Sequence, residues 1–162
     1  MTLVWTRVDQ KLIHGQITVA WVPHLAIDAV VVSDSDTAED PWVQKVMMMG
    51  LPPEVRVTRF TAPANLAEIL ADEELLARRV LVIFKDIGGV TAAAEAGLRL
   101  ERLNLGNQAC QPANRDIRLT DAFYASEDDL AGLSGLLVDN INLEVILQAV
   151  PAEKAVKWHP RD

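Results

Sequence analysis

The sequence predicts a single α/β domain of three layers, in which helices cover both faces of a mainly parallel sheet of six to seven strands. Short runs of apolar and β-branched residues alternate with stretches of helical period along the whole chain. This alternation implies right-handed crossovers and hence parallel strands. The length of 162 residues, 50% of them hydrophobic, suits one domain with a sizeable core, and neither an internal repeat nor a low-complexity linker divides it.

In the first half of the chain, uninterrupted apolar runs mark strands buried on both faces, and apolar residues spaced three or four apart mark helices. Pro41 suits a first helical turn, Pro52-Pro53 ends that helix, and Thr61 is a plausible N-cap. The expected elements are a strand at 3–5, a loop at 7–16, a helix at 17–25, a strand at 29–33, a helix at 41–50, a strand at 55–60, a helix at 62–70 and a strand at 80–84.

The second half continues the same alternation. Gly88-Gly89 opens a helix with a small-residue inner face, and Ser126 followed by three carboxylates is a strong helix start. The expected elements are a helix at 88–98, a strand at 102–105, a surface loop at 108–118, a sixth strand at 122–125, a helix at 126–140, a last strand at 143–150 and a tail at 151–162.

The loop at 7–16 holds the most specific pattern in the chain. Arg7 and Lys11 precede His14, and Gly15-Gln16 lead into the first turn of the following helix. The free N–H groups and the dipole of a helix N-terminus favour a neutral, nucleophilic imidazole, and would stabilise a phosphoryl group bound to it. Spacing alone leaves two interpretations open: His14 is a nucleophile for phosphoryl transfer, or it only caps the helix.

Several polar loops follow strand ends and can meet this histidine. In a parallel sheet the ligand crevice lies at the carboxyl ends of the strands. The loops at Asp34, at Lys85-Asp86 and at Gly106-Asn107 all come directly after expected strands. We therefore expect them to converge with the His14 loop on one edge of the sheet.

The run Arg7-Val8-Asp9-Gln10-Lys11-Leu12-Ile13-His14-Gly15-Gln16, followed by a helix with Trp21, resembles the active-site signature of the IIB components of the mannose/fructose/sorbose family of the sugar phosphotransferase system (PTS). The similarity extends over roughly 3–158. The further matching segments are Val31-Val32-Ser33-Asp34, Leu81-Val82-Ile83-Phe84-Lys85 and Leu103-Asn104-Leu105-Gly106-Asn107.

This resemblance implies a three-layer α/β/α fold and a phosphoryl-carrier transferase. His14 would accept a phosphoryl group through Nδ1 from the phosphohistidine of a IIA protein, and pass it to a sugar held by a membrane IIC/IID permease. Backbone donors of Gly15 and Gln16 would hold the phosphoryl oxygens, while Arg7 and Lys11 would balance their charge. No metal, nucleotide or other cofactor is required. The sugar itself is not specified, because in this family the permease selects it.

Lys11 stands where the family usually has arginine, so it keeps the charge but loses the planar pair of donors. Asp9 can orient Arg7 or Lys11 by ion pairing. Asp34, with Asp36 nearby, could bind a metal, but two carboxylates without a third ligand favour a helix cap.

Composition excludes other classes of function. A net charge of −8, from 23 acidic and 15 basic residues, argues against nucleic-acid binding. No apolar run approaches the roughly 20 residues of a membrane span, and no signal sequence begins the chain. A single cysteine, Cys110, permits neither an internal disulfide nor a cysteine-based zinc cluster. We expect a cytoplasmic protein that reaches the membrane through its permease, with homo-oligomerisation left open.

The remaining candidates are weaker. His24 and His159 are expected to be solvated, and Met47-Met48-Met49 to fill the core or an interface. A nucleotide-binding enzyme would need more glycines in the first loop, and a phosphohistidine phosphatase or mutase would need a second active-site histidine. The serious alternative is a IIB-like phosphoprotein that regulates a partner and does not serve transport.

Overall fold

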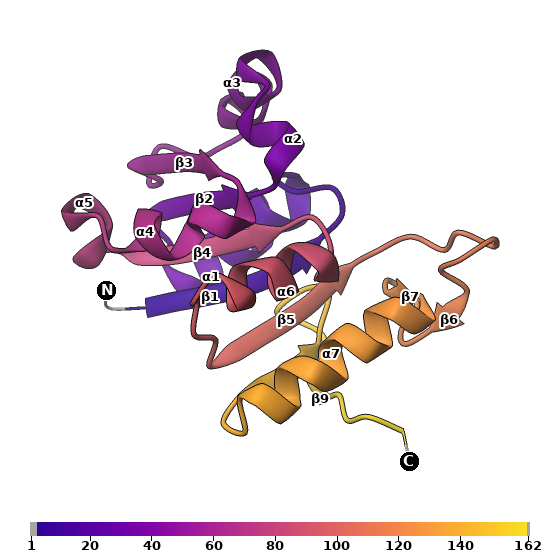
Figure 1. The fold of residues 1–162 in the computed structure, drawn as a ribbon. Helices are drawn as coiled ribbons and strands as arrows, with labels where there is room; N and C mark the ends of the chain where they lie inside the picture. Colours follow the sequence, from indigo (N-terminus) through magenta and orange to yellow (C-terminus); the bar gives the residue numbers. More distant parts are fainter. Residues whose placement is uncertain (1–2, 162) are drawn as a thin grey trace.

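Strand β1 (Leu3–Asp9) lies near the middle of a twisted sheet in the computed structural model, which describes residues 3–161 (Figure 1). The other strands of this sheet are β2 (Ala29–Ser33), β3 (Val57–Thr61), β4 (Arg79–Phe84), β5 (Arg102–Asn107), β8 (Glu144–Leu147) and β9 (Val156–Lys157). They are ordered β3-β2-β4-β1-β5-β8-β9, and every neighbouring pair is parallel except β8 and β9. The predicted fold class is thus confirmed.

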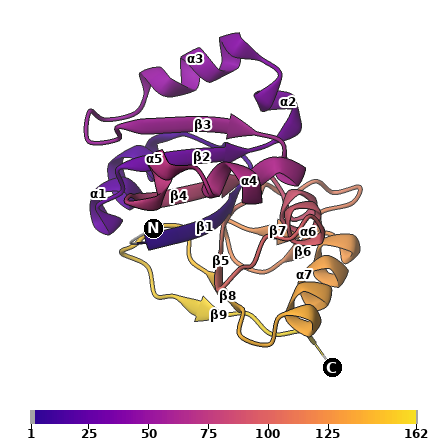
Figure 2. The ribbon, with the colours of Figure 1, turned by 60° about the vertical axis from the view of Figure 1, so that its left-hand side comes forward.

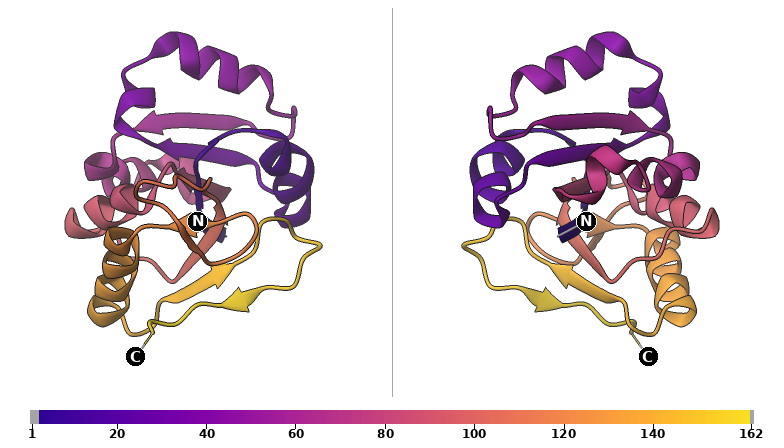
Figure 3. Two further views of the ribbon diagram at one scale, coloured as in Figure 1. Left: turned by 90° about the vertical axis from the view of Figure 1, so that its right-hand side faces the viewer. Right: turned by 90° about the vertical axis from the view of Figure 1, so that its left-hand side faces the viewer.

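Helices cover both faces of the sheet (Figures 2 and 3). A π-helical turn η1 (Gln16–Trp21) and α1 (Val22–Leu25) pack on one face, and α6 (Ile87–Glu95) and α7 (Glu127–Asp139) pack on the other. Alternate residues of β2 divide between the two cores: Val31 joins the α6 side, whereas Val30 and Val32 join the η1 side. Burial on both faces explains why the central strands read as continuous apolar runs.

Carboxylates and hydroxyls start several helices, as the sequence indicates. Asp40 accepts a hydrogen bond from the Val43 amide at the start of α3 (Pro41–Met49), whose first residue is Pro41. Ser126 and Asp129 form a reciprocal capping box at α7. The cap of α6 is Asp86 and not a glycine, so that helix begins one residue before the predicted Gly88-Gly89 start.

The segment between β5 and α7 differs from the prediction. We expected a surface loop at 108–118 and a sixth strand of the sheet at 122–125. Instead β6 (Ile117–Arg118) and β7 (Tyr124–Ala125) form a separate two-stranded antiparallel hairpin. A bridge between Gln108 and Phe123 connects this hairpin region to the residue after β5, and β8 takes the place beside β5 itself.

The carboxyl-terminal segment is also not the predicted tail. β8 is shorter than the predicted strand at 143–150, and the chain then turns back so that β9 pairs antiparallel with it. Trp158 is only 8% exposed, and its amide donates to the Val145 carbonyl at 2.8 Å. Residues after 150 therefore complete the sheet edge and the core.

Smaller corrections concern the middle of the chain. Thr61 is the last residue of β3 and not a helix cap; a 3₁₀ turn η2 (Pro63–Asn65) leads into α4 (Leu66–Leu70), and α5 (Glu73–Leu76) follows. The methionine run fills the core only in part, because α3 lies beyond the β3 edge and has no fully buried residue (Figure 1). Met47 is half-buried and packs against the core on the η1 side, whereas Met48 is exposed. Met49 is 80% exposed and Trp42 is 71% exposed.

Candidate active site

The strand β1 runs further than predicted, and this decides where the signature residues lie. Arg7 and Asp9 belong to the strand, and only the residues after Asp9 form the loop. The Leu12 amide donates to the Asp9 carbonyl at 3.0 Å, and Leu12 has a positive φ of 58°, which is uncommon for a residue other than glycine. This tight turn brings His14 back over the end of β1.

His14 and Asp9 form the central contact of the site. Nε2 of His14 lies 2.7 Å from Oδ2 of Asp9, whose side chain is fully buried, while the His14 side chain is 19% exposed. A carboxylate only accepts hydrogen bonds, so the neutral ring carries its proton on Nε2. Nδ1 then keeps its lone pair, and it forms no hydrogen bond with any residue of the described range 3–161.

Arg7 lies beneath this pair and does not reach the surface. Its side chain is 0% exposed, and it donates to Asp9 Oδ2 from both Nε (3.2 Å) and an Nη atom (3.1 Å). Further acceptors are Asn104 Oδ1 at 2.6 Å, the Gln148 carbonyl at 3.1 Å, the Ala149 carbonyl at 2.9 Å and Gln16 Oε1 at 3.4 Å. Burial lowers the pKa of Arg7, and the charge and hydrogen bonds of Asp9 act against that shift.

The other signature residues lie at the surface around His14. Lys11 is exposed, and its backbone amide donates to Asp9 Oδ1 at 3.0 Å. Gly15 is also exposed and has ordinary right-handed backbone angles; a Cβ there would meet nothing within 4 Å. The Gly15 and Gln16 amides form no hydrogen bond with other residues of the part that the structure describes. Both amides can therefore donate to a group bound at the imidazole.

The helix after His14 differs from the expected α-helix. It opens as the π-helical turn η1, in which the amides of Ile17 and Thr18 both donate to the His14 carbonyl, at 2.9 and 3.0 Å. π-helical turns are rare and often occur at functional sites. Trp21 ends this turn, with its ring centroid 5.3 Å from Arg7 Cζ and its indole N–H bonded to the Ala149 carbonyl at 2.9 Å.

Asp34 lies at the same edge of the sheet but has a local role. Its Oδ2 accepts from the Thr37 amide (3.1 Å) and hydroxyl (2.7 Å), which caps α2 (Ser35–Ala38). This confirms the cap interpretation. In residues 3–161 no three His, Cys, Asp or Glu side chains are grouped as a metal site. His24 and His159 are exposed and separate from His14, as expected.

Sequence reasoning missed the residues that hold Arg7 in place. Asn104 and the Gln148–Ala149 backbone are separated from Arg7 by about a hundred residues or more along the chain. One signal was available: Asn104 is a polar residue between two apolar ones in a buried strand. A buried amide of this kind needs partners, which identifies the position as part of a polar network.

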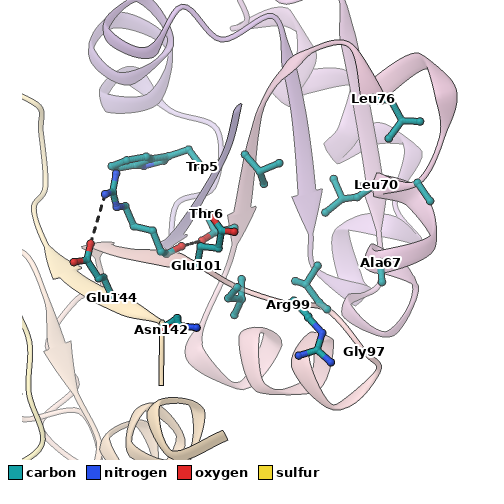
Figure 4. A pocket seen from close by; sticks show the side chains of 15 residues that line it. Trp5, Thr6, Ala67, Leu70, Leu76, Gly97, Arg99, Glu101, Asn142 and Glu144 are labelled. Carbon is teal, nitrogen blue, oxygen red and sulfur yellow. Dashed lines mark hydrogen bonds and ion pairs between the residues drawn. The ribbon is translucent and has the colours of Figure 1, made fainter. Parts of the chain in front are cut away.

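A pocket of about 1100 Å³ lies at the opposite end of the strands. Figure 4 shows Trp5, Glu144 and Asn142 on one side of it and Leu70 and Leu76 on the other. It borders the beginning of β1, whereas His14 follows the end of that strand. The pocket is therefore separate from the His14 site.

Residues 3–160 match the family model of the PTS system sorbose subfamily IIB component. The chain belongs to this family. It is 30% identical over 156 residues, 95% of the chain and 94% of the relative, to the N-acetylgalactosamine-specific phosphotransferase enzyme IIB component 2 of Escherichia coli K12. It superimposes with a TM-score of 0.81 on the IIBSor domain of the sorbose permease from Klebsiella pneumoniae (21% identity; 95% and 92% of the two chains) and on manxB from Thermoanaerobacter tengcongensis (26%; 95% and 91%).

Family membership fixes the general activity. IIB components are phosphotransferases of the sugar phosphotransferase system, and they act with IIA and membrane IIC/IID components. None of the helices within residues 3–161 of this IIB component has the length and apolar character needed to cross a membrane.

Proposed function

We propose that this IIB component carries a phosphoryl group on Nδ1 of His14, taken from the phosphohistidine of a IIA protein and passed to a sugar held by a IIC/IID permease. The observation that carries the proposal is the 2.7 Å contact between His14 Nε2 and Asp9 Oδ2. It keeps the ring proton on Nε2 and leaves Nδ1 as the nucleophile.

The proposed reaction consists of two successive phosphoryl transfers, and each of them breaks one bond to phosphorus and forms another. Nδ1 of His14 attacks the phosphorus of the IIA phosphohistidine, the donor N–P bond breaks, and the Nε2 proton stays on the ring, directed at Asp9. In the second step a sugar hydroxyl attacks the same phosphorus and gives its proton to a base of the permease's sugar site or to water as the O–P bond forms. The N–P bond breaks, and His14 leaves as the neutral imidazole that still carries its Nε2 proton. Asp9 stabilises the ring while the bond to phosphorus is made and broken.

The residues around Nδ1 suit a phosphoryl group. The amides of Gly15 and Gln16 are donors of the kind that bind phosphate oxygens, and the exposed Lys11 ammonium supplies a mobile cation. Arg7 adds a buried positive charge whose donors are already engaged by protein acceptors. Positioning and charge are the main requirements of phosphoryl transfer, so this set is sufficient without a metal.

The protein would work at the membrane surface, docked in turn on IIA and on the permease. Its sugar is that of the permease; the similar E. coli protein is described as N-acetylgalactosamine-specific. A permease-dependent sugar phosphorylation assay distinguishes this role from a purely regulatory phosphoprotein, which would be phosphorylated without passing the group on.

The test is incubation with a phosphorylated IIA protein, followed by intact-mass measurement and ³¹P NMR. We expect one added phosphoryl group with the shift of an Nδ1-phosphohistidine, absent in His14→Ala and retained in His159→Ala, the matched control at an exposed histidine. An unphosphorylated wild-type protein, or label that survives in His14→Ala, contradicts the proposal.

A further inference from the structure

We propose that Gly106 and Asn104 of β5 are positioning residues for phosphoryl transfer: they seat the Arg7 guanidinium, which holds the Asp9 carboxylate against His14. The inference rests on the proposed role of His14. It assigns an indirect contribution to two residues of β5 whose hydrogen bonds, within residues 3–161, do not include the His14 imidazole.

Gly106 is required for space and not for backbone conformation. A Cβ at this position would overlap with Cζ and both Nη atoms of Arg7, at separations that real Cβ contacts do not reach. Gly97 alone has a positive φ among the described glycines, so alanine can adopt the backbone angles of Gly106. The side chain that a Cβ would displace is therefore the guanidinium of Arg7.

An arginine at the surface could swing away from such a methyl group, but Arg7 cannot do so without loss. Its guanidinium is fully buried and bonded to Asp9, to Asn104 and to the carbonyls of Gln148 and Ala149. The ring of Trp21 limits it further, with the centroid 5.3 Å from Cζ. Any shift large enough to admit a Cβ breaks several of these bonds together.

Asn104 fixes the same group from another direction. Its Oδ1 accepts from Arg7 Nη1 at 2.6 Å, and its Nδ2 donates to the Gln148 carbonyl at 3.0 Å. The Gln148 carbonyl also accepts from Arg7 Nη1, at 3.1 Å. Asn104 thus links the arginine to the segment after β8 and leaves the guanidinium one orientation in which all its acceptors are met.

The chain of contacts ends at the imidazole. Two Arg7 nitrogens donate to Asp9 Oδ2, the same oxygen that lies 2.7 Å from His14 Nε2. Moving Arg7 therefore moves or rotates the carboxylate that sets the His14 tautomer. β5 is suited to this role because it pairs directly with β1, with Arg7 opposite Asn104 in the register.

The test compares Gly106→Ala with Gly135→Ala. Gly135 lies in α7, where a Cβ meets nothing within 4 Å, so this variant controls for the glycine-to-alanine change itself. We expect Gly106→Ala to lower the single-turnover rate of phosphorylation by phospho-IIA about 10- to 100-fold, the cost of a misplacement of about 1 Å. Two-dimensional ¹H–¹⁵N NMR of the His14 ring is expected to show a mixture of tautomers in place of the Nε2–H form.

A double variant shows whether the effect passes through Arg7. Lysine at position 7 is shorter and leaves room for the Cβ, so Arg7→Lys/Gly106→Ala should be phosphorylated faster than Gly106→Ala alone. A purely structural glycine would instead give losses that add. Should Gly106→Ala fail to fold, Asn104→Leu removes the acceptor without adding a clash and is read by the same tautomer spectrum.

The outcomes separate this inference from the proposed function. If wild-type protein is not phosphorylated on His14, the proposed function fails. If the wild type is phosphorylated but Gly106→Ala and Asn104→Leu keep the Nε2–H tautomer and the wild-type rate, the proposed function stands and the positioning role is wrong.

Discussion

Asp9 Oδ2 accepts hydrogen bonds from both His14 Nε2, at 2.7 Å, and the Arg7 guanidinium, at 3.1 Å. Asp9 is the last residue of β1 and is fully buried, whereas His14 lies at the rim of the following loop. One oxygen thus links a buried cation to a partly exposed imidazole. This geometry makes Asp9 the residue on which both the stability and the reactivity of the site depend.

Asp9→Asn should lower the rate of His14 phosphorylation by about 10²- to 10⁴-fold, because an amide N–H toward Nε2 favours the tautomer with the proton on Nδ1. Single-turnover transfer from phospho-IIA measures the loss. Asp34→Asn is the matched control, because the Asp34 carboxylate is bonded to Thr37 and an asparagine can still cap α2. Equal rates for Asp9→Asn and wild type would show that Asp9 does not set the reactive tautomer of His14.

Arg7→Met and Lys11→Met should show that the two cations of the signature have different roles, one in stability and the other in the rate of phosphorylation. Removing Arg7 leaves the buried Asp9 carboxylate without its ion pair and should cost about 3–5 kcal/mol of unfolding free energy. Lys11 is exposed, so its loss should change stability by less than about 0.5 kcal/mol while slowing phosphorylation. Urea unfolding followed by far-UV circular dichroism gives both values; similar costs for the two variants would contradict the assignment.

Lys11→Arg should retain or improve phosphoryl acceptance. Arginine restores the planar pair of donors that suits phosphate, and the exposed position has room for it. The measurement is the phosphorylation rate at several salt concentrations. A large loss on this substitution would show that Lys11 acts otherwise than as a cation for the phosphoryl group.

Trp158→Ala should cost about 3–5 kcal/mol of unfolding free energy, the usual range for a buried large aromatic side chain. Trp158 is 8% exposed and belongs to the core under α6 and α7. The exposed neighbour provides the control, since His159→Ala should stay within about 0.5 kcal/mol. A cost for Trp158→Ala as small as that of the control would mean that this segment is a tail after all.

Ala26→Gly should stabilise the protein by about 0.5–1 kcal/mol, because Ala26 ends α1 in the left-handed region, with φ 50°, where a Cβ is unfavourable. The opposite sign is expected for Ala92→Gly at an exposed position inside α6, which should destabilise by about 1 kcal/mol. Thermal unfolding of the two variants beside wild type provides the comparison. Destabilisation by both would contradict this account of Ala26.

The spacing of hydrophobic residues along the sequence was enough to predict most of the architecture. The continuous runs at 29–33 and 80–84 are strands buried on both faces, and the caps at Asp40 and Ser126 lie at the predicted helix starts. These are local properties, since a strand or a helix start is selected by residues only a few positions apart. β7 and β9 are too short for their hydrophobic residues to show a period. The prediction therefore placed the strand at 122–125 in the main sheet, and it described the segment that holds β9 as a tail.

The sequence by itself determined the fold class, the family signature around His14 and the edge of the sheet on which its loop lies. Only the tertiary structure decided that Arg7 points into the interior, that Asp9 faces the imidazole, and that Gly106 leaves room for a guanidinium. It also decided that Met47 of α3 packs against the core while Met48 and Met49 are exposed. The physical reason is the separation along the sequence, since Arg7 contacts Asn104 and Ala149, which are 97 and 142 positions away. Contacts between residues so far apart depend on strand order and register.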